Sequence, residues 1–118
     1  MEEQVKNEIS LMVNELDESQ LKVEKHAFDV INASDKNLNA VKEGIENVQE
    51  ILDKISSCDR MTEQERSETD RIKDVLGKIL ETATSVNDES RKLEHRVAKQ
   101  RDIVDRAEDV LVNFYNME

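Results

Sequence analysis

The sequence has no proline or tryptophan, two glycines and 3% aromatic residues in a length of 118. Strands and tight turns rely on glycine, proline and clusters of aromatic residues, so this scarcity argues against a β-sheet fold. Charged residues make up 38% of the chain, and aliphatic residues supply most of the apolar side chains. This composition favours long helices. We therefore expect an all-α chain.

Large side chains are too few to fill a globular core. A single chain of this kind buries only a thin seam of contacts, and such small cores usually need a partner to become stable. The length allows one domain at most. We therefore expect a single coiled-coil domain over residues 1–118 that associates as a homodimer or with another helix-bundle protein.

Basic residues are also scarce, with 17 Lys and Arg against 28 Asp and Glu and a net charge of −11. Nucleic acids and anionic membranes attract basic faces, so neither is expected as a partner. The longest apolar run is too short to span a membrane, and Met1-Glu2-Glu3 lacks the positive charge of a signal peptide. A single cysteine, Cys58, forms no internal disulfide. These observations favour the cytoplasm.

The basic residues that are present gather in the second half of the chain. The main members of this stretch are Arg91, Lys92, Arg96, Lys99, Arg101 and Arg106. Residues 1–57, in contrast, carry 13 acidic and 6 basic side chains. We expect the basic stretch to be a solvated helix face that meets the acidic half of the same or another chain.

Residues that carry chemistry do not form a recognisable group. His26 and His95 lack a His or Glu four residues away, the spacing of a helical zinc site. A nucleophilic cysteine needs a neighbouring base. The polar surroundings of Cys58 suggest an exposed residue without a catalytic role. Gly44 and Gly77 stand alone, so no phosphate-binding loop is present. We expect no catalytic activity, metal, cofactor or small-molecule substrate.

Aliphatic residues recur at alternating steps of three and four, as the a and d positions of coiled-coil heptads do. A looser pattern begins at Val5. The first regular run comes after it and consists of Leu38, Val41, Ile45, Val48, Leu52 and Ile55. The second run consists of Ile72, Leu76, Ile79, Ala83, Val86, Ser90, Leu93, Val97, Gln100, Val104, Ala107, Leu111 and Phe114. A period of 3.5 residues predicts helices, and we call these two sets the helix-interaction seams.

The two seams are out of register. Extending the first seam places the charged residues Asp59 and Arg66 at core positions, so the phase slips between about 56 and 66. Within that segment, Thr62-Glu63-Gln64-Glu65 has the spacing of a capping box at a helix start. This predicts helices over about 3–57 and 62–116 with a break at about 57–62. The helices either fold back as a long antiparallel hairpin or continue as one kinked rod with a stutter.

One hairpin buries little surface against the entropy of ordering its helices, whereas two hairpins cover the same seams much better. We therefore expect assembly into a four-helix coiled-coil bundle. Gln100 stands at a seam position where an apolar residue belongs. A polar residue at such a position fixes the helix register or the number of partners. Alternatively, Gln100 is an ordinary glutamine that is tolerated because this part of the seam is partly solvated.

Three segments resemble the C-terminal cytoplasmic arm of methyl-accepting chemotaxis receptors. They are Asn7-Glu8-Ile9-Ser10-Leu11-Met12-Val13-Asn14-Glu15-Leu16, Ile31-Asn32-Ala33-Ser34-Asp35 and Leu111-Val112-Asn113-Phe114-Tyr115. The resemblance implies a signalling module that acts through helix packing. The glycine- and alanine-rich tip that binds the kinase in that family is absent, so kinase control is not implied. Glu89, which follows Thr84-Ser85-Val86-Asn87-Asp88, is the one candidate for a methylation-type modification.

A fourth segment, Val97-Ala98-Lys99-Gln100-Arg101-Asp102-Ile103-Val104-Asp105-Arg106-Ala107, resembles the central layer of a Q-type SNARE motif. This resemblance implies a membrane-fusion helix, although the chain continues for only about half the expected layers after Gln100. The leading interpretation is a non-catalytic coiled-coil interaction or signalling module. The alternatives are a SNARE-like helix and a small helical secretion chaperone or adaptor.

Overall fold

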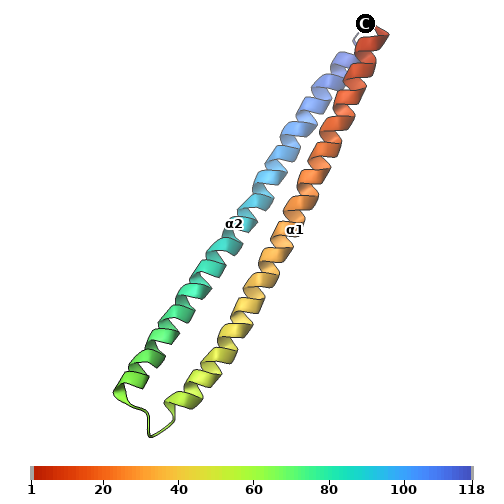
Figure 1. Ribbon diagram of the computed structural model, residues 1–118. Coiled ribbons are helices and arrows are strands. Elements are labelled where there is room, and N and C mark those ends of the chain that lie inside the picture. Colours follow the sequence, from red (N-terminus) through yellow and green to blue (C-terminus); the bar gives the residue numbers. More distant parts are fainter. Residues whose placement is uncertain (1, 118) are drawn as a thin grey trace. The chain divides into compact units, whose positions relative to one another are not determined.

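The computed structural model describes residues 2–117, and over this range the chain forms two α-helices and no strand. α1 spans Glu3–Ser56 and α2 spans Glu63–Tyr115. The two helices are joined by a short connection and pack as a hairpin (Figure 1). The expected all-α hairpin is therefore confirmed, and the alternative of one continuous helix is not the structure that forms.

The chain divides into two compact units, each built from one segment of α1 and one of α2. The tip unit is Asn32–Ser90 and contains the connection. The terminal unit consists of the residues up to Ile31 and those from Arg91 onwards. Within each unit the two segments run antiparallel (Figure 1).

The connection between the helices closes without glycine or proline. The Cys58 N–H donates to the carbonyl of Ile55 at 3.0 Å, and the Ser57 hydroxyl donates to the carbonyl of Lys54 at 2.8 Å. A turn follows, in which the Met61 N–H donates to the Cys58 carbonyl at 3.3 Å. In the described range no residue, glycine or otherwise, has a positive φ. Ordinary side-chain and backbone bonds are thus sufficient to end α1.

The expected cap at the start of α2 is present, with one difference. The Thr62 hydroxyl oxygen accepts the Glu65 N–H at 3.1 Å, which satisfies one of the free donors at the helix start. The Glu65 carboxylate accepts a hydrogen bond from the same hydroxyl at 3.0 Å, instead of reaching the backbone N–H of Thr62. α2 consequently begins at Glu63, close to the expected position.

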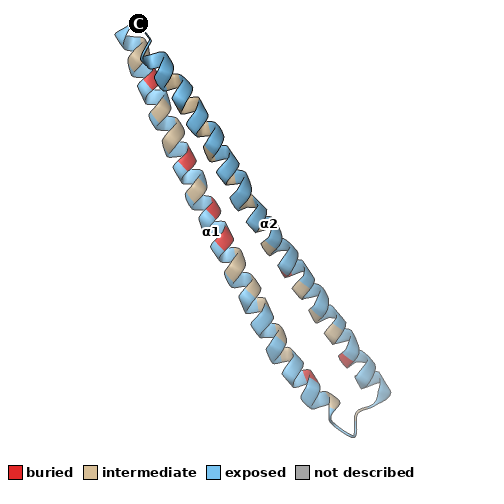
Figure 2. Ribbon diagram, turned by 180° about the vertical axis from the view of Figure 1, so that it is seen from behind, coloured by how far each residue is buried: buried red, intermediate tan, exposed pale blue. Residues whose placement is uncertain are grey.

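The core of the tip unit is a narrow line of contacts between the two helices (Figure 2). α1 contributes the buried Leu52 and the half-buried Leu38, Val41, Ile45 and Val48. α2 contributes the buried Thr69 and Ala83 and the half-buried Leu76 and Leu80. The small side chain of Ala83 lets the helices approach closely at that level.

In the terminal unit most of the burial is on α1 (Figure 2). The buried residues there are Ile9, Gln20, Ala27 and Ile31. They face the half-buried residues of α2, which include Leu93, Val97, Arg101, Val104, Ala107 and Leu111. Within the described range no large side chain is fully buried. The seam is therefore thin, as the composition predicts.

Candidate helix-binding face

In the tip unit, three stripes of α2 residues run along the side that meets α1, each with a step of seven. The middle stripe is buried or half-buried and consists of Thr69, Leu76, Ala83 and Ser90. One flank is half-buried and consists of Lys73, Leu80 and Asn87. The other flank is exposed and consists of Ile72, Ile79 and Val86. α1 therefore covers the more polar flank of α2 and leaves its apolar flank open.

Polar contacts hold α1 against the covered flank. The Lys73 ammonium lies 3.6 Å from an Asp53 carboxylate oxygen. The Asn87 side-chain amide donates to the Asp35 carboxylate at 2.8 Å and to the Ser34 hydroxyl at 3.3 Å. These bonds link the helices on one side only, because the apolar flank has no equivalent groups. They lie on the flank opposite Ile72, Ile79 and Val86.

The exposed apolar residues of the tip unit lie together. Across residues 32–90, all of which the structure describes, the exposed large hydrophobic residues are Ile51, Ile55, Ile72, Val75, Ile79 and Val86. Their spacing places them on the same side of the two helices, and we call them the apolar face. Between 43% and 56% of each residue's surface is exposed. Single exposed aliphatic residues are ordinary, whereas a contiguous set is a candidate interaction surface.

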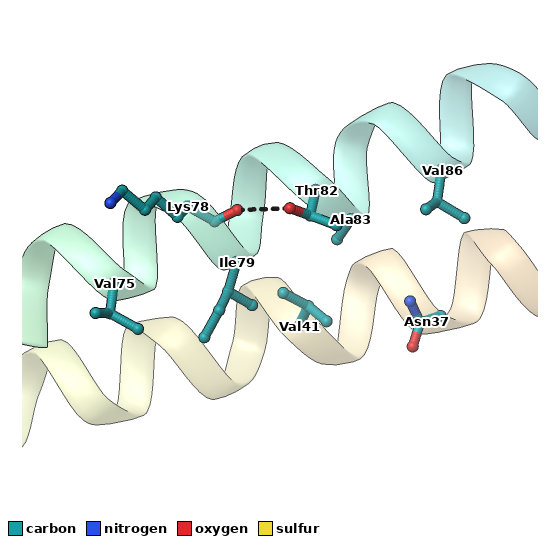
Figure 3. A pocket seen from close by; sticks show the side chains of 8 residues that line it. All are labelled: Asn37, Val41, Val75, Lys78, Ile79, Thr82, Ala83 and Val86. Carbon is teal, nitrogen blue, oxygen red and sulfur yellow. Dashed lines mark hydrogen bonds between the residues drawn. The ribbon is translucent and has the colours of Figure 1, made fainter.

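The centre of the apolar face is a groove of about 400 Å³ between the helices. Val75, Ile79 and Val86 of α2 lie along it with Val41 of α1 beside them (Figure 3). The other lining residues are Asn37, Lys78, Thr82 and Ala83. A second hollow, beside the connection, includes Ile55 and Ile72 of the same face, but Glu65 and Glu68 also line it. Low charge is therefore a property of the part of the face around the central groove.

The apolar face is almost free of charge, although 38% of the chain is charged. The positions of α1 that border it are Ala33, Asn37, Ala40, Gly44, Asn47 and Ile51. The corresponding positions of α2 are Ile72, Val75, Ile79, Thr82 and Val86. Lys78 is the charged residue among those that line the groove. Such a face suits an apolar, neutral surface better than a charged ligand.

The terminal unit has a polar layer at the place where the sequence predicts Gln100 in the seam. Arg101 is half-buried, and its Nε and Nη2 donate to the two carboxylate oxygens of Glu24 at 2.8 and 2.9 Å. Its Nη1 donates to Asp17 at 3.1 Å and to Asp105 at 3.4 Å. Arg101, one member of the basic stretch, thus joins α2 to two acidic residues of α1.

Gln20 belongs to the same layer and is 2% exposed. Its side-chain amide donates to the Val97 carbonyl at 3.5 Å. The hydrogen bonds from Arg101 lower the pKa of Glu24, and a hydrogen bond from Gln20 lowers it by a smaller amount. Partial burial raises this pKa but offsets only part of the shift. The hydrogen bonds to Glu24 and Asp17 raise the pKa of Arg101 in turn. Both groups are therefore charged at neutral pH.

Replacing Glu24 with Gln should make the stability of the chain less sensitive to acid. A lowered folded-state pKa means that the ion pair contributes fully above the ordinary Glu value of about 4.5 and is lost as the pH falls below it. The wild type should exceed Glu24→Gln in its urea midpoint at neutral pH, and this difference should shrink in acid. The exposed Glu18→Gln serves as the control. A difference between wild type and Glu24→Gln that is independent of pH would contradict the assignment.

The residues of the predicted seams divide between covered and open positions. On α1, Leu52 is buried, Leu38, Val41, Ile45 and Val48 are half-buried, and Ile55 is exposed. On α2, Ala83 is buried, and the half-buried members are Leu76, Ser90, Leu93, Val97, Val104, Ala107 and Leu111. The exposed members are Ile72, Ile79, Val86, Gln100 and Phe114. That another helix covers these exposed members stays a prediction.

Sequence reasoning missed the residues next to the predicted ones. The contact between the helices uses Leu80, Asn87 and Arg101, each one position after a predicted seam residue, and it also uses Gln20. The sequence places Arg101 in the basic stretch and not in the seam. The spacing gave no signal for them, because Leu80 and Asn87 repeat at the same step of seven as Ile79 and Val86. Glu89, the candidate modification site, is exposed on α2.

The described residues contain no group of three or more His, Cys, Asp or Glu placed to hold a metal ion. Cys58, His26 and His95 are exposed. Neither helix, over the range that the structure describes, has a segment apolar enough to cross a membrane. No protein-family model matches the chain, and no curated protein or solved structure is significantly similar to it.

Proposed function

We propose that this chain is a non-catalytic helix-binding module whose apolar face packs against further helices in a four-helix coiled coil. One observation carries the proposal. α1 covers the more polar flank of α2, which contains Lys73 and Asn87, and leaves the flank with Ile72, Ile79 and Val86 exposed. The interaction or signalling role is the one that the resemblance to the chemotaxis-receptor arm implies.

The energetics of burial favour this role. Removing apolar surface from water stabilises an assembly by about 25 cal/mol per Å², and six aliphatic residues of the tip unit are about half exposed. An added helix covers such a surface by placing its own apolar residues at steps of three and four in the groove. The heptad spacing of Ile72, Ile79 and Val86 matches that type of partner.

The chemistry of the groove also supports binding over catalysis. An active site brings several polar groups together in a water-excluded cavity. The groove between Val41 and Ile79 is lined mainly by aliphatic side chains, and the Thr82 hydroxyl donates to the Lys78 carbonyl of its own helix at 3.0 Å (Figure 3). It therefore offers apolar contact area.

A photo-crosslinking amino acid placed at position 79 tests the proposal in cells that express the protein. Position 79 lies in the apolar face, and the exposed position 81 lies on the outer side of the same helix. Irradiation should give a covalent adduct of defined mass from position 79 and none from position 81. The proposal fails if position 79 gives no adduct, or if both positions give the same ones.

A further inference from the structure

We infer that the apolar face binds a second copy of this chain, with α2 of each copy packed over α1 of the other. This inference rests on the proposed function and names its partner. It is drawn from three properties of the tip unit, which are the scarcity of charge around the central groove, the distribution of large and small residues beside it, and the open space beside Gly44.

The charge of the chain limits where two copies can meet. Each copy carries a net charge of −11, so most pairs of surfaces would bring like charges together. The apolar face is the part with the least charge, because around its central groove Lys78 is the one charged residue of the lining. A neutral face matched with itself needs no opposite charge on the partner.

Large and small residues are distributed unequally over the two helices. Beside the groove, α2 contributes the aliphatic side chains of Ile79 and Val86, whereas α1 contributes the small residues Ala40 and Gly44. The large residues of α1 in the face, Ile51 and Ile55, lie nearer the connection. A two-fold axis along the helices would place each α2 over the α1 of the other copy. The protruding side chains of one copy then meet positions with a small side chain or none on the other copy. This is the self-complementarity of an isologous contact.

Gly44 supports this arrangement because the hairpin itself does not need it. A Cβ added at this position would meet no atom within 4 Å, and its φ is not positive. Glycine inside a helix is destabilising by roughly 1 kcal/mol relative to alanine. The missing side chain leaves room in the face, at the level of Val41 and the groove, for Ile79 of the other copy.

Gly77 provides a matched control. A Cβ there also meets no atom within 4 Å, but the position lies beyond the polar flank of α2, away from the apolar face. Gly44→Leu and Gly77→Leu therefore make the same chemical change in the same type of helix. Only the first fills the proposed interface, and it does so with an apolar residue that leaves the face hydrophobic.

The mass of the purified chain, measured by light scattering over a range of concentrations, tests the inference. The wild type and Gly77→Leu should reach twice the 13.6 kDa of one chain. Gly44→Leu should weaken the dimer by about tenfold or more in Kd. Ile79→Glu should be monomeric, with helicity by circular dichroism retained because the residue is half exposed.

Two results would overturn the inference. One is a wild type that stays at 13.6 kDa at every concentration, and the other is an equal effect of the two leucine substitutions. If the wild type is monomeric and position 79 crosslinks to a different protein, the second copy is ruled out as the partner and the helix-binding function stands. If the wild type is monomeric and position 79 gives no adduct, both the second copy and the helix-binding function are ruled out.

Discussion

Ile31→Ala should lower the free energy of unfolding by about 2–3 kcal/mol, since it removes buried methyl groups and leaves a cavity. Ile31 is 9% exposed and lies in the thin seam of the terminal unit. The seam has few buried residues to share the loss, because no large side chain of the described range is fully buried. Urea unfolding followed by circular dichroism measures the change.

Phe28→Ala is the matched control for this prediction. Phe28 is three residues earlier on the same helix, has a larger side chain and is 63% exposed. Its removal should change the free energy of unfolding by no more than about 0.5 kcal/mol. If Phe28→Ala destabilised the chain as much as Ile31→Ala, the assignment of the buried side of α1 would be wrong.

Val97→Asp should destabilise the chain by about 3 kcal/mol, because it places a carboxylate without a partner in the seam. Val97 is half-buried, and its carbonyl accepts the hydrogen bond of the buried Gln20. The new charge would also stand one turn from Arg101, whose acidic partners are Glu24 and Asp17. Arg101 already pairs with these carboxylates and with Asp105, so their repulsion offsets the attraction of its guanidinium for the new charge.

Ala98→Asp separates the effect of burial from that of adding a charge. Ala98 is the next residue on α2 and is exposed, so its substitution introduces the same carboxylate into solvent. Its melting temperature should stay close to that of the wild type, whereas that of Val97→Asp should fall clearly. A Val97→Asp variant that melts with the wild type would contradict the position of the seam.

Local sequence was sufficient for the helices and for the break between them. The absence of proline and the steps of three and four predict two long helices, and Thr62 with Glu65 predicts the start of the second. These features act within a few residues of one another, through backbone hydrogen bonds and a side-chain cap. They are therefore visible in the sequence without knowledge of the fold.

The rotation of α2 against α1 was decided only by the tertiary structure. Each stripe of α2 repeats every seven residues, so the spacing alone fits a helix turned toward Ile79 and one turned toward Leu80 equally well. What selects the second orientation is a set of contacts between distant residues, such as Asn87 with Asp35 and Arg101 with Glu24. The sequence by itself determined that this chain has apolar stripes along two helices. The polar bonds across the seam decided which stripe stays uncovered, because their partners are 52 and 77 residues apart and no local pattern connects them.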